Sequence, residues 1–345
     1  MKSISIYYLS SFLGLMAGSM FNYTIVIYSH SLSENERFAG IVFFTAYIPF
    51  LFLSWKAGHT LDHHSRKLVV GLSQVLSATS CLVPALLSAS GLLHSGNREL
   101  LILFTLLSGV AMSFIMPGRL AILGDLARER LAQATMVQNV FMLLGFALAP
   151  ILAGWLRQDF PFSILFLVNG LMYLASLGLL LFVRLLPAEP RETNVDVRAF
   201  LKTSALPRQI LIALFLSMVI VGPIQVLLPK FGKEILLLGE TARGILMGML
   251  GTGLIAGAVI ARRFAQVFHR GRILIAAISL SGFTFLGTAL STQPIPAALA
   301  LVLAGICLGM ITGFAPALLQ EHTPNQVRGR AMSLFSLLFL LTPAV

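Results

Sequence analysis

The residue types best suited to chemistry gather in one short polar segment, Gly58-His59-Thr60-Leu61-Asp62-His63-His64-Ser65-Arg66-Lys67. The carboxylate of Asp62 is followed by the basic residues Arg66 and Lys67, so the segment can form ion pairs and hydrogen bonds to charged groups. Partners of both signs occur later in the chain, at Asp125, Arg328 and Arg330. Two interpretations are open: a set of specific contacts, or a solvated turn that holds its charges in water.

Other chemistries have little support. His59, His63 and His64 offer metal-ligand atoms, but no second cluster with closed spacing accompanies them, so no metal site is predicted. Cys81 and Cys307 lie inside apolar runs, where thiols usually pack as small apolar groups. The chain has no Gly-rich phosphate loop and no Ser/His/Asp arrangement. We therefore expect no enzyme, no cofactor and no ATPase within this chain, although a separate ATPase subunit stays open.

The elements that must position these residues are helices in a membrane. Hydrophobic residues make up 57% of the 345 positions and charged residues 11%, with a mean hydropathy of +0.90. Soluble domains carry roughly 25% charged residues, so we expect this chain to be dissolved in a lipid bilayer. The formal net charge of +11 is spread over the turns between apolar runs. It therefore gives no reason to expect a nucleic-acid partner.

Apolar runs were compared with the about 20 residues that a helix needs to cross a bilayer. Eleven runs are predicted, at 5–28, 37–57, 67–93, 99–123, 132–156, 160–185, 209–231, 243–261, 272–291, 295–319 and 329 to the end. Polar, Gly or Pro residues bound each of them. The first run is too long for a cleaved signal peptide, and we expect it to remain as a span.

Lys and Arg residues set the expected orientation. With a cytoplasmic N-terminus, the even-numbered turns carry most of them, among others Lys56, Arg130 and Arg263, while the opposite side has few. Cytoplasmic loops carry an excess of these residues, so the N-terminus is predicted to be cytoplasmic in a bacterial-type inner membrane.

The longest hydrophilic stretch, 187–208, carries mixed charge and the prolines Pro190 and Pro207, and it is predicted to be a cytoplasmic linker. It separates an expected N-terminal six-helix bundle, 1–186, from a five-helix C-terminal bundle, 209–345. Two halves of six repeated spans are the layout of major facilitator transporters. We therefore expect an all-α, two-bundle major facilitator fold whose last helix is missing from a truncated chain.

The segment 58–67 resembles the signature loop of the major facilitator superfamily, Gly-x-Leu-Ala-Asp-Arg-x-Gly-Arg-Lys. Gly58, Asp62, Arg66 and Lys67 stand at the matching positions, and a partial second copy lies at 269–272. A carboxylate at a helix end can bind the N-terminus of another helix, where the macrodipole favours negative charge. We expect Asp62 to meet Arg328 and Arg330 at the start of the eleventh span, and Arg66 to pair with Asp125. Such contacts would form a cytoplasmic gate.

The fifth predicted span contains a small-residue stripe with a proline. Its segment 145–154 resembles the antiporter signature Gly-x-x-x-Gly-Pro-x-x-Gly-Gly through Gly145, Ala149, Pro150 and Gly154. Small residues let a neighbouring helix approach closely. Glycines of the eighth span, 243–261, offer a matching surface, so we expect these two helices to pack together. Ordinary membrane packing is the alternative interpretation.

Two further segments are similar to the siderophore and macrolide exporter branch of the superfamily. They are 117–134, which begins Pro-Gly-Arg-Leu-Ala-Ile-Leu-Gly-Asp-Leu, and 319–333. The same branch also resembles lysophospholipid flippases, so the substrate stays open.

The family resemblance implies that spans one, four, seven and ten line a substrate cavity. The candidate lining residues are Asn22, Tyr23, Ser113, Arg119, Ser217, Gln225 and Thr312. Each polar side chain can instead bond its own helix backbone, and Arg119 can instead bind a lipid phosphate or Asp125. No Asp or Glu lies near the middle of a span, so Asp62 and Asp125 are the candidates for proton coupling.

The resulting expectation is a monomeric secondary transporter that exports a small amphipathic molecule, such as a siderophore or drug, by proton antiport. A flippase or importer of the same fold is the first alternative. A transport-inactive, truncated membrane protein is the alternative of another class.

Overall fold

A computed structural model of the chain describes residues 2–33, 36–127, 131–184, 201–219, 221–263 and 270–323, with the isolated helical positions 331, 334, 335 and 338. All regular structure within these ranges is helical, and nine helical segments among them are long and apolar enough to cross a membrane. The prediction of an all-α membrane protein is confirmed.

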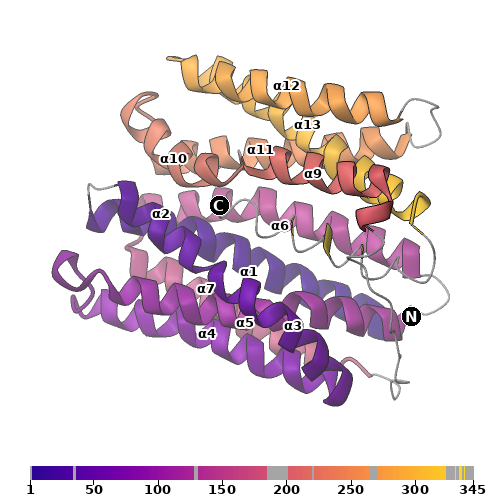
Figure 1. The fold of residues 1–345 in the computed structure, drawn as a ribbon. Helices are drawn as coiled ribbons and strands as arrows, with labels where there is room; N and C mark the ends of the chain where they lie inside the picture. Colours follow the sequence, from indigo (N-terminus) through magenta and orange to yellow (C-terminus); the bar gives the residue numbers. More distant parts are fainter. Residues whose placement is uncertain are drawn as a thin grey trace. The chain divides into compact units, whose positions relative to one another are not determined.

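The helices follow the predicted runs closely (Figure 1). They are α1 (Lys2–Leu32), α2 (Glu36–Thr45), α3 (Ile48–His63), α4 (Arg66–Ala89), the short η1 (Ser95–Asn97), α5 (Leu100–Leu126), α6 (Leu131–Asp159), α7 (Phe162–Leu181), α9 (Ala205–Val219), α10 (Val221–Glu234), α11 (Glu240–Arg263), α12 (Arg270–Leu290) and α13 (Pro294–Glu321). The helix expected from 329 onward lies almost wholly outside the described residues. α9 begins at Ala205, inside the stretch predicted to be linker.

The predicted second span, 37–57, is two helices rather than one. The backbone turns at Ala46 and Tyr47, whose amides donate to carbonyls three residues back, at 3.2 and 2.9 Å. Pro49 explains the break, because proline has no amide hydrogen and disfavours helical backbone in the preceding residue. Gly109 of α5 accommodates this corner, since a Cβ there would lie 3.0 Å from the Pro49 ring.

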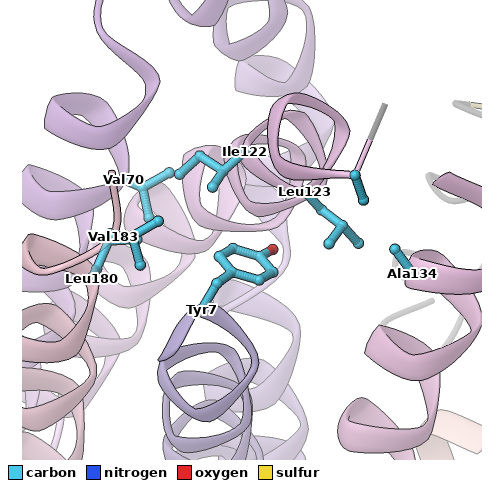
Figure 2. Packing of buried hydrophobic residues seen from close by; sticks show 8 residues of the cluster. Tyr7, Val70, Ile122, Leu123, Ala134, Leu180 and Val183 are labelled. Atoms are coloured by element: carbon cyan, nitrogen blue, oxygen red, sulfur yellow. The ribbon is translucent and has the colours of Figure 1, made fainter. Parts of the chain in front are cut away.

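Contacts divide the chain into two compact units, and the first contains residues 1–191 and 239–248. Within it, α1 packs against α5, α6 and α7, and α4 packs against α5 and α7. Figure 2 shows the ring of Tyr7 among apolar side chains from α4, α5, α6 and α7. The cluster comprises Tyr7, Val70, Ile122, Leu123, Ala127, Ala134, Leu180 and Val183. This core joins the N-terminal ends of α1, α4 and α6 to the C-terminal ends of α5 and α7.

The second unit contains residues 192–238 and 249–345. In it α12 lies along α13, and α11 meets α13 through glycines on both helices. A Cβ on Gly253 would lie 2.8 Å from Cα of Gly305, and a Cβ on Gly257 would lie 2.9 Å from Cα of Gly309. Two backbones approach this closely only where both helices lack side chains at the crossing.

The crossing can be tested with Gly257→Ala. The added methyl group has no free space between α11 and α13, so we expect a loss of about 1–3 kcal/mol of stability from overpacking. Thermal unfolding of the purified protein would show a lower Tm. Gly282→Ala on α12 is the matched control, because no described atom lies within 4 Å of its Cβ position. Equal Tm values for the two variants would contradict the glycine crossing.

Candidate functional site

The predicted signature loop is mostly helix. Gly58 and Asp62 lie in the last turns of α3, and α4 already begins at Arg66. The amide of His64 donates to the carbonyl of Thr60 at 2.9 Å and closes the end of α3. The side chain of Asp62 and both expected partners, Arg328 and Arg330, lie outside the described part of the chain. The contact between them stays a prediction.

Arg66 and Asp125 form an ion pair that joins the start of α4 to the end of α5. Nη1 of Arg66 donates to Oδ1 of Asp125 at 2.5 Å and lies 3.5 Å from the carbonyl oxygen of Ala121. The two side chains are 18% and 10% exposed, so water reaches this pair only in part. The expected pairing is therefore present, and it fixes one carboxylate that can accept a proton.

Lys67 has a role that the sequence did not indicate. Its Nζ atom donates to the carbonyl oxygens of Leu181 and Val183, at 2.5 and 2.9 Å. These carbonyls lie at the C-terminal end of α7, where free acceptors and the negative end of the helix dipole attract a cation. Lys67 thus caps a neighbouring helix.

The histidines of the same segment bond locally. The rings of His59 and His63 stack with centroids 4.1 Å apart, and Nδ1 of His63 lies 2.9 Å from the carbonyl oxygen of His59. Among the described residues no group of three or more His, Cys, Asp or Glu side chains is arranged to hold a metal ion.

Arg119 is the most deeply buried charged side chain of the candidate set, with 1% of its surface exposed. Its Nη1 atom donates to the hydroxyl of Ser11 on α1 at 2.9 Å, and Nη2 donates to the hydroxyl of Ser176 on α7 at 2.7 Å. Its backbone carbonyl accepts from the hydroxyl of Tyr7 at 2.6 Å. The guanidinium therefore ties three helices together.

Two glutamines extend this network to five helices. Gln138 of α6 donates to the Ser11 hydroxyl at 2.9 Å, and Gln74 of α4 donates to the Ser176 hydroxyl at 2.9 Å. Ser10 and Ser176 also exchange hydroxyl-to-carbonyl bonds of 2.7 and 2.6 Å. Sequence reasoning missed these five residues, although each is a polar side chain inside an apolar run.

The alternatives considered for Arg119 are corrected by this geometry. Asp125 is occupied by Arg66, and the Arg119 guanidinium instead bonds serine hydroxyls. Arg119 also stands seven residues before the end of α5, roughly 10 Å along the helix axis. Its side chain is buried between helices and is not exposed at the surface of the unit.

Three of the other cavity candidates bond their own helices. Asn22 donates to the hydroxyl of Tyr47 at 3.1 Å, and Tyr23 is buried. Three hydroxyls bond carbonyls of their own helices: Ser113 to Gly109 at 2.8 Å, Ser217 to Ala213 at 2.5 Å and Thr312 to Gly309 at 3.0 Å. Gln225 is partly exposed. For the three hydroxyls the alternative of backbone bonding is the one observed.

The small-residue stripe of α6 contacts two different helices. A Cβ on Gly145 would lie 3.1 Å from the backbone nitrogen of Met16 on α1. A Cβ on Gly154 would lie 2.9 Å from Cα of Gly244, in the first turns of α11 that belong to the same unit. The expected packing of α6 on α11 is present through Gly154, whereas Gly145 faces α1. Ala149 and Ala153 are fully buried.

Polar bonds reinforce the contact between α6 and α11. The hydroxyl of Thr241 donates to Oε1 of Gln158 at 2.5 Å and lies 3.5 Å from the carbonyl oxygen of Gly154. Arg243 and Glu240 form an ion pair one turn apart on α11. The crossing is therefore held by backbone proximity and by side-chain bonds at its end.

Comparison with known proteins places this geometry in context. The family model described as Major Facilitator Superfamily matches residues 7–345. An uncharacterized MFS-type transporter, y4rN, of Sinorhizobium fredii is 25% identical over an aligned length of 345. The alignment covers 94% of this chain and 82% of that protein.

Several solved transporters have a similar fold. A bacterial homologue of the human lysosomal transporter Spinster aligns with a TM-score of 0.74 at 14% identity, covering 98% of this chain and 78% of its own. A variant of the nucleoside transporter NupG aligns with a TM-score of 0.78 at 11% identity and coverages of 98% and 89%. The xylose transporter XylE from E. coli gives 0.73 at 18% identity, with coverages of 99% and 87%. At these identities the likeness concerns the fold.

Gly14→Ala tests the position of the Arg119 guanidinium. A Cβ there would lie 2.5 Å from Nη2 of Arg119 and 2.9 Å from the hydroxyl of Ser176, so the Arg119 guanidinium must move. We expect a stability loss of about 1–3 kcal/mol, measured as a lower Tm. Gly178→Ala on α7 is the control, because no described atom lies within 4 Å of its Cβ position.

A double-mutant cycle gives the decisive comparison. If the loss arises from collision with the guanidinium, Gly14→Ala should cost less in an Arg119→Met background, and the two changes will be non-additive. Additive losses would show that Gly14 is required for another reason.

Proposed function

The chain belongs to the Major Facilitator Superfamily, and from this premise we propose that it exports a small amphipathic molecule, such as a siderophore or a drug, in exchange for protons. It is a multi-pass membrane transporter of the superfamily and not an enzyme. Its substrate is a small molecule bound within the membrane. Export, the substrate class and proton coupling are the proposed parts.

One observation carries the proposal of antiport: the close contact of α6 with α11. The segment that resembles the antiporter signature places Gly154 against Gly244, and a Cβ on Gly248 would lie 2.8 Å from the carbonyl oxygen of Ala147. The contacts of Gly154 with Gly244 involve backbone atoms, whereas Gly248 packs against the side chain of Ile151. A crossing made mostly of backbone and small residues lets the two helices shift against each other during alternating access with little repacking.

Asp62 and Asp125 are the proposed proton-coupling residues. The pair of Asp125 with Arg66 supports this role, because protonation removes the negative charge and weakens the contact. The gate through Asp62, Arg328 and Arg330 would respond in the same way. Proton binding on one side would then release contacts that hold one state closed.

The membrane orientation and organisation follow from the sequence. We propose an inner membrane location with a cytoplasmic N-terminus, because Lys and Arg concentrate in the corresponding turns. We further propose two pseudo-symmetric bundles, 1–186 and 209–345, joined by a cytoplasmic linker, in a monomer of the siderophore and macrolide exporter branch.

Other functions of the same fold remain alternatives that an experiment separates. A D-xylose-proton symporter is among the solved structures of similar fold, and symport is the coupling opposite to the one proposed. A lysophospholipid flippase would move lipid, and a transport-inactive protein would move nothing.

Cellular accumulation of labelled siderophore and of fluorescent drugs tests the proposal. Cells that contain the protein should accumulate less substrate than cells without it, and an uncoupler should abolish the difference because the proton gradient supplies the free energy. Gly154→Leu should also abolish it, since the larger side chain separates α6 from α11. Gly178→Leu is the control on α7. Higher accumulation would show import, and an unchanged panel would point to lipid or to an inactive protein.

Asp125→Asn tests the coupling role. The amide cannot carry the charge that pairs with Arg66, so we expect export to fall about tenfold and to lose its dependence on the proton gradient. Glu234→Gln is the control, because the Glu234 side chain is exposed and lies 3.8 Å from Nζ of Lys230. Asp62→Asn should behave like Asp125→Asn. Gradient-driven export that survives in both aspartate variants would remove them from the coupling mechanism.

A further inference from the structure

We propose that the network around Arg119 binds the carboxylate of an amphipathic, singly charged anion, which is the solute moved by the transporter. This inference rests on the proposed transport of a small amphipathic molecule and adds the charge of that molecule. It assigns the anionic group to Arg119 and the neighbouring hydroxyl of Tyr173, and the apolar remainder to the region of Met112.

The first argument is the missing counter-charge. Arg119 is buried, and its observed bonds go to the neutral hydroxyls of Ser11 and Ser176. The described acidic side chains near arginines in this unit form ion pairs with other arginines. Asp125 pairs with Arg66, Glu99 with Arg98, and Glu240 with Arg243. A buried cation is stabilised by an anion and is costly to bury without one.

The second argument is a guanidinium donor that has no partner. The Ser11 hydroxyl accepts from Arg119 and Gln138, and the Ser176 hydroxyl accepts from Arg119 and Gln74. A hydroxyl oxygen has two lone pairs, so both serines are fully used as acceptors. Nε of Arg119 is buried without a partner, and the side-chain oxygens of Gln74 and Gln138 in the same network also lack one. A carboxylate provides about four acceptor sites in a plane that matches the guanidinium fork.

The third argument is the position of a second unpartnered donor. The hydroxyl of Tyr173 is buried, and the polar group beside it is the hydroxyl of Ser77; neither makes a hydrogen bond of normal geometry. The Tyr173 hydroxyl would lie 3.2 Å from a Cβ on Gly18, one turn along α1 from Gly14, whose Cβ position adjoins the Arg119 guanidinium. The tyrosine hydroxyl and the guanidinium therefore lie against the same glycine face of α1.

The surroundings select an amphipathic ligand over a small inorganic anion. Met112 lies beside the same glycine face, with its methyl carbon 3.4 Å from the Cβ position of Gly18. A thioether side chain adapts its shape to irregular apolar groups. A charged fork next to a flexible apolar side chain fits a molecule that carries one carboxylate on an apolar body.

Binding to the purified full-length protein provides the test. Naphthalene-2-carboxylate is the probe, and naphthalene-2-carboxamide is its uncharged match. We expect the carboxylate to raise Tm in a concentration-dependent manner and to bind about tenfold more tightly than the amide. Arg119→Gln should remove this difference. Arg98→Gln, which changes a partly exposed arginine that bonds the hydroxyl of Ser33, should retain it.

A second variant supplies the carboxylate internally. Gln138→Glu places an acid beside the Ser11 hydroxyl, so it should raise Tm in the absence of ligand and weaken naphthalene-2-carboxylate binding about tenfold. Gln158→Glu, near the other end of the same helix, should leave binding unchanged. This variant keeps the test valid even if Arg119→Gln does not fold.

Three results would overturn the site: equal affinity for the two naphthalene probes, unchanged carboxylate affinity in both Arg119→Gln and Gln138→Glu, or no carboxylate binding to folded wild-type protein. Acetate that binds as tightly as the naphthalene probe would show a site for small free anions instead. Because binding is measured without transport, a protein that binds the probe through Arg119 but exports nothing would lose the export proposal alone.

Discussion

A guanidinium buried among helices is the constraint on which the first unit depends. Water is absent from the bilayer core, so each polar group there must find its partner within the protein. For Arg119 the partners come from Ser11 and Ser176, and glutamines of two further helices bond the same hydroxyls. The apolar cluster around Tyr7 holds the adjoining ends of these helices, and the Tyr7 hydroxyl also bonds the Arg119 carbonyl. Packing and polar bonding therefore support the same arrangement.

Close backbone approach is the second principle of the fold. In the first unit Gly154 admits the start of α11, and in the second unit Gly253 and Gly257 admit α13. α11 thus uses different glycines along its length for different neighbours. In lipid, where apolar side chains gain little by leaving the solvent, such contacts rely on dispersion and on matched surfaces. The same feature suits a transporter whose helices must shift.

The sequence predicted the membrane class and most helix positions, because long apolar runs have one stable form in a bilayer. It also indicated the pair of Arg66 with Asp125, since both lie at helix ends near one another in the expected topology. The break at Ala46 and Tyr47 was missed although Pro49 marks it, because the apolar run continues through the turn. The Arg119 network and the Lys67 cap were also missed. Their partners lie more than fifty residues away in sequence, and hydropathy does not specify which faces of distant helices meet.

The corner between α2 and α3 has a mechanical consequence. α2 has 10 residues, about 15 Å of helix, which is half of the roughly 30 Å hydrocarbon layer. This segment therefore consists of two short helices. At their junction Pro49 has no amide hydrogen with which to continue the helical hydrogen bonds. Bending at that point leaves the hydrogen bonds within α2 and within α3 intact, so the angle between the two helices can change. A rotation of α3 that begins at its His63 end can therefore be taken up at this junction before it reaches α2.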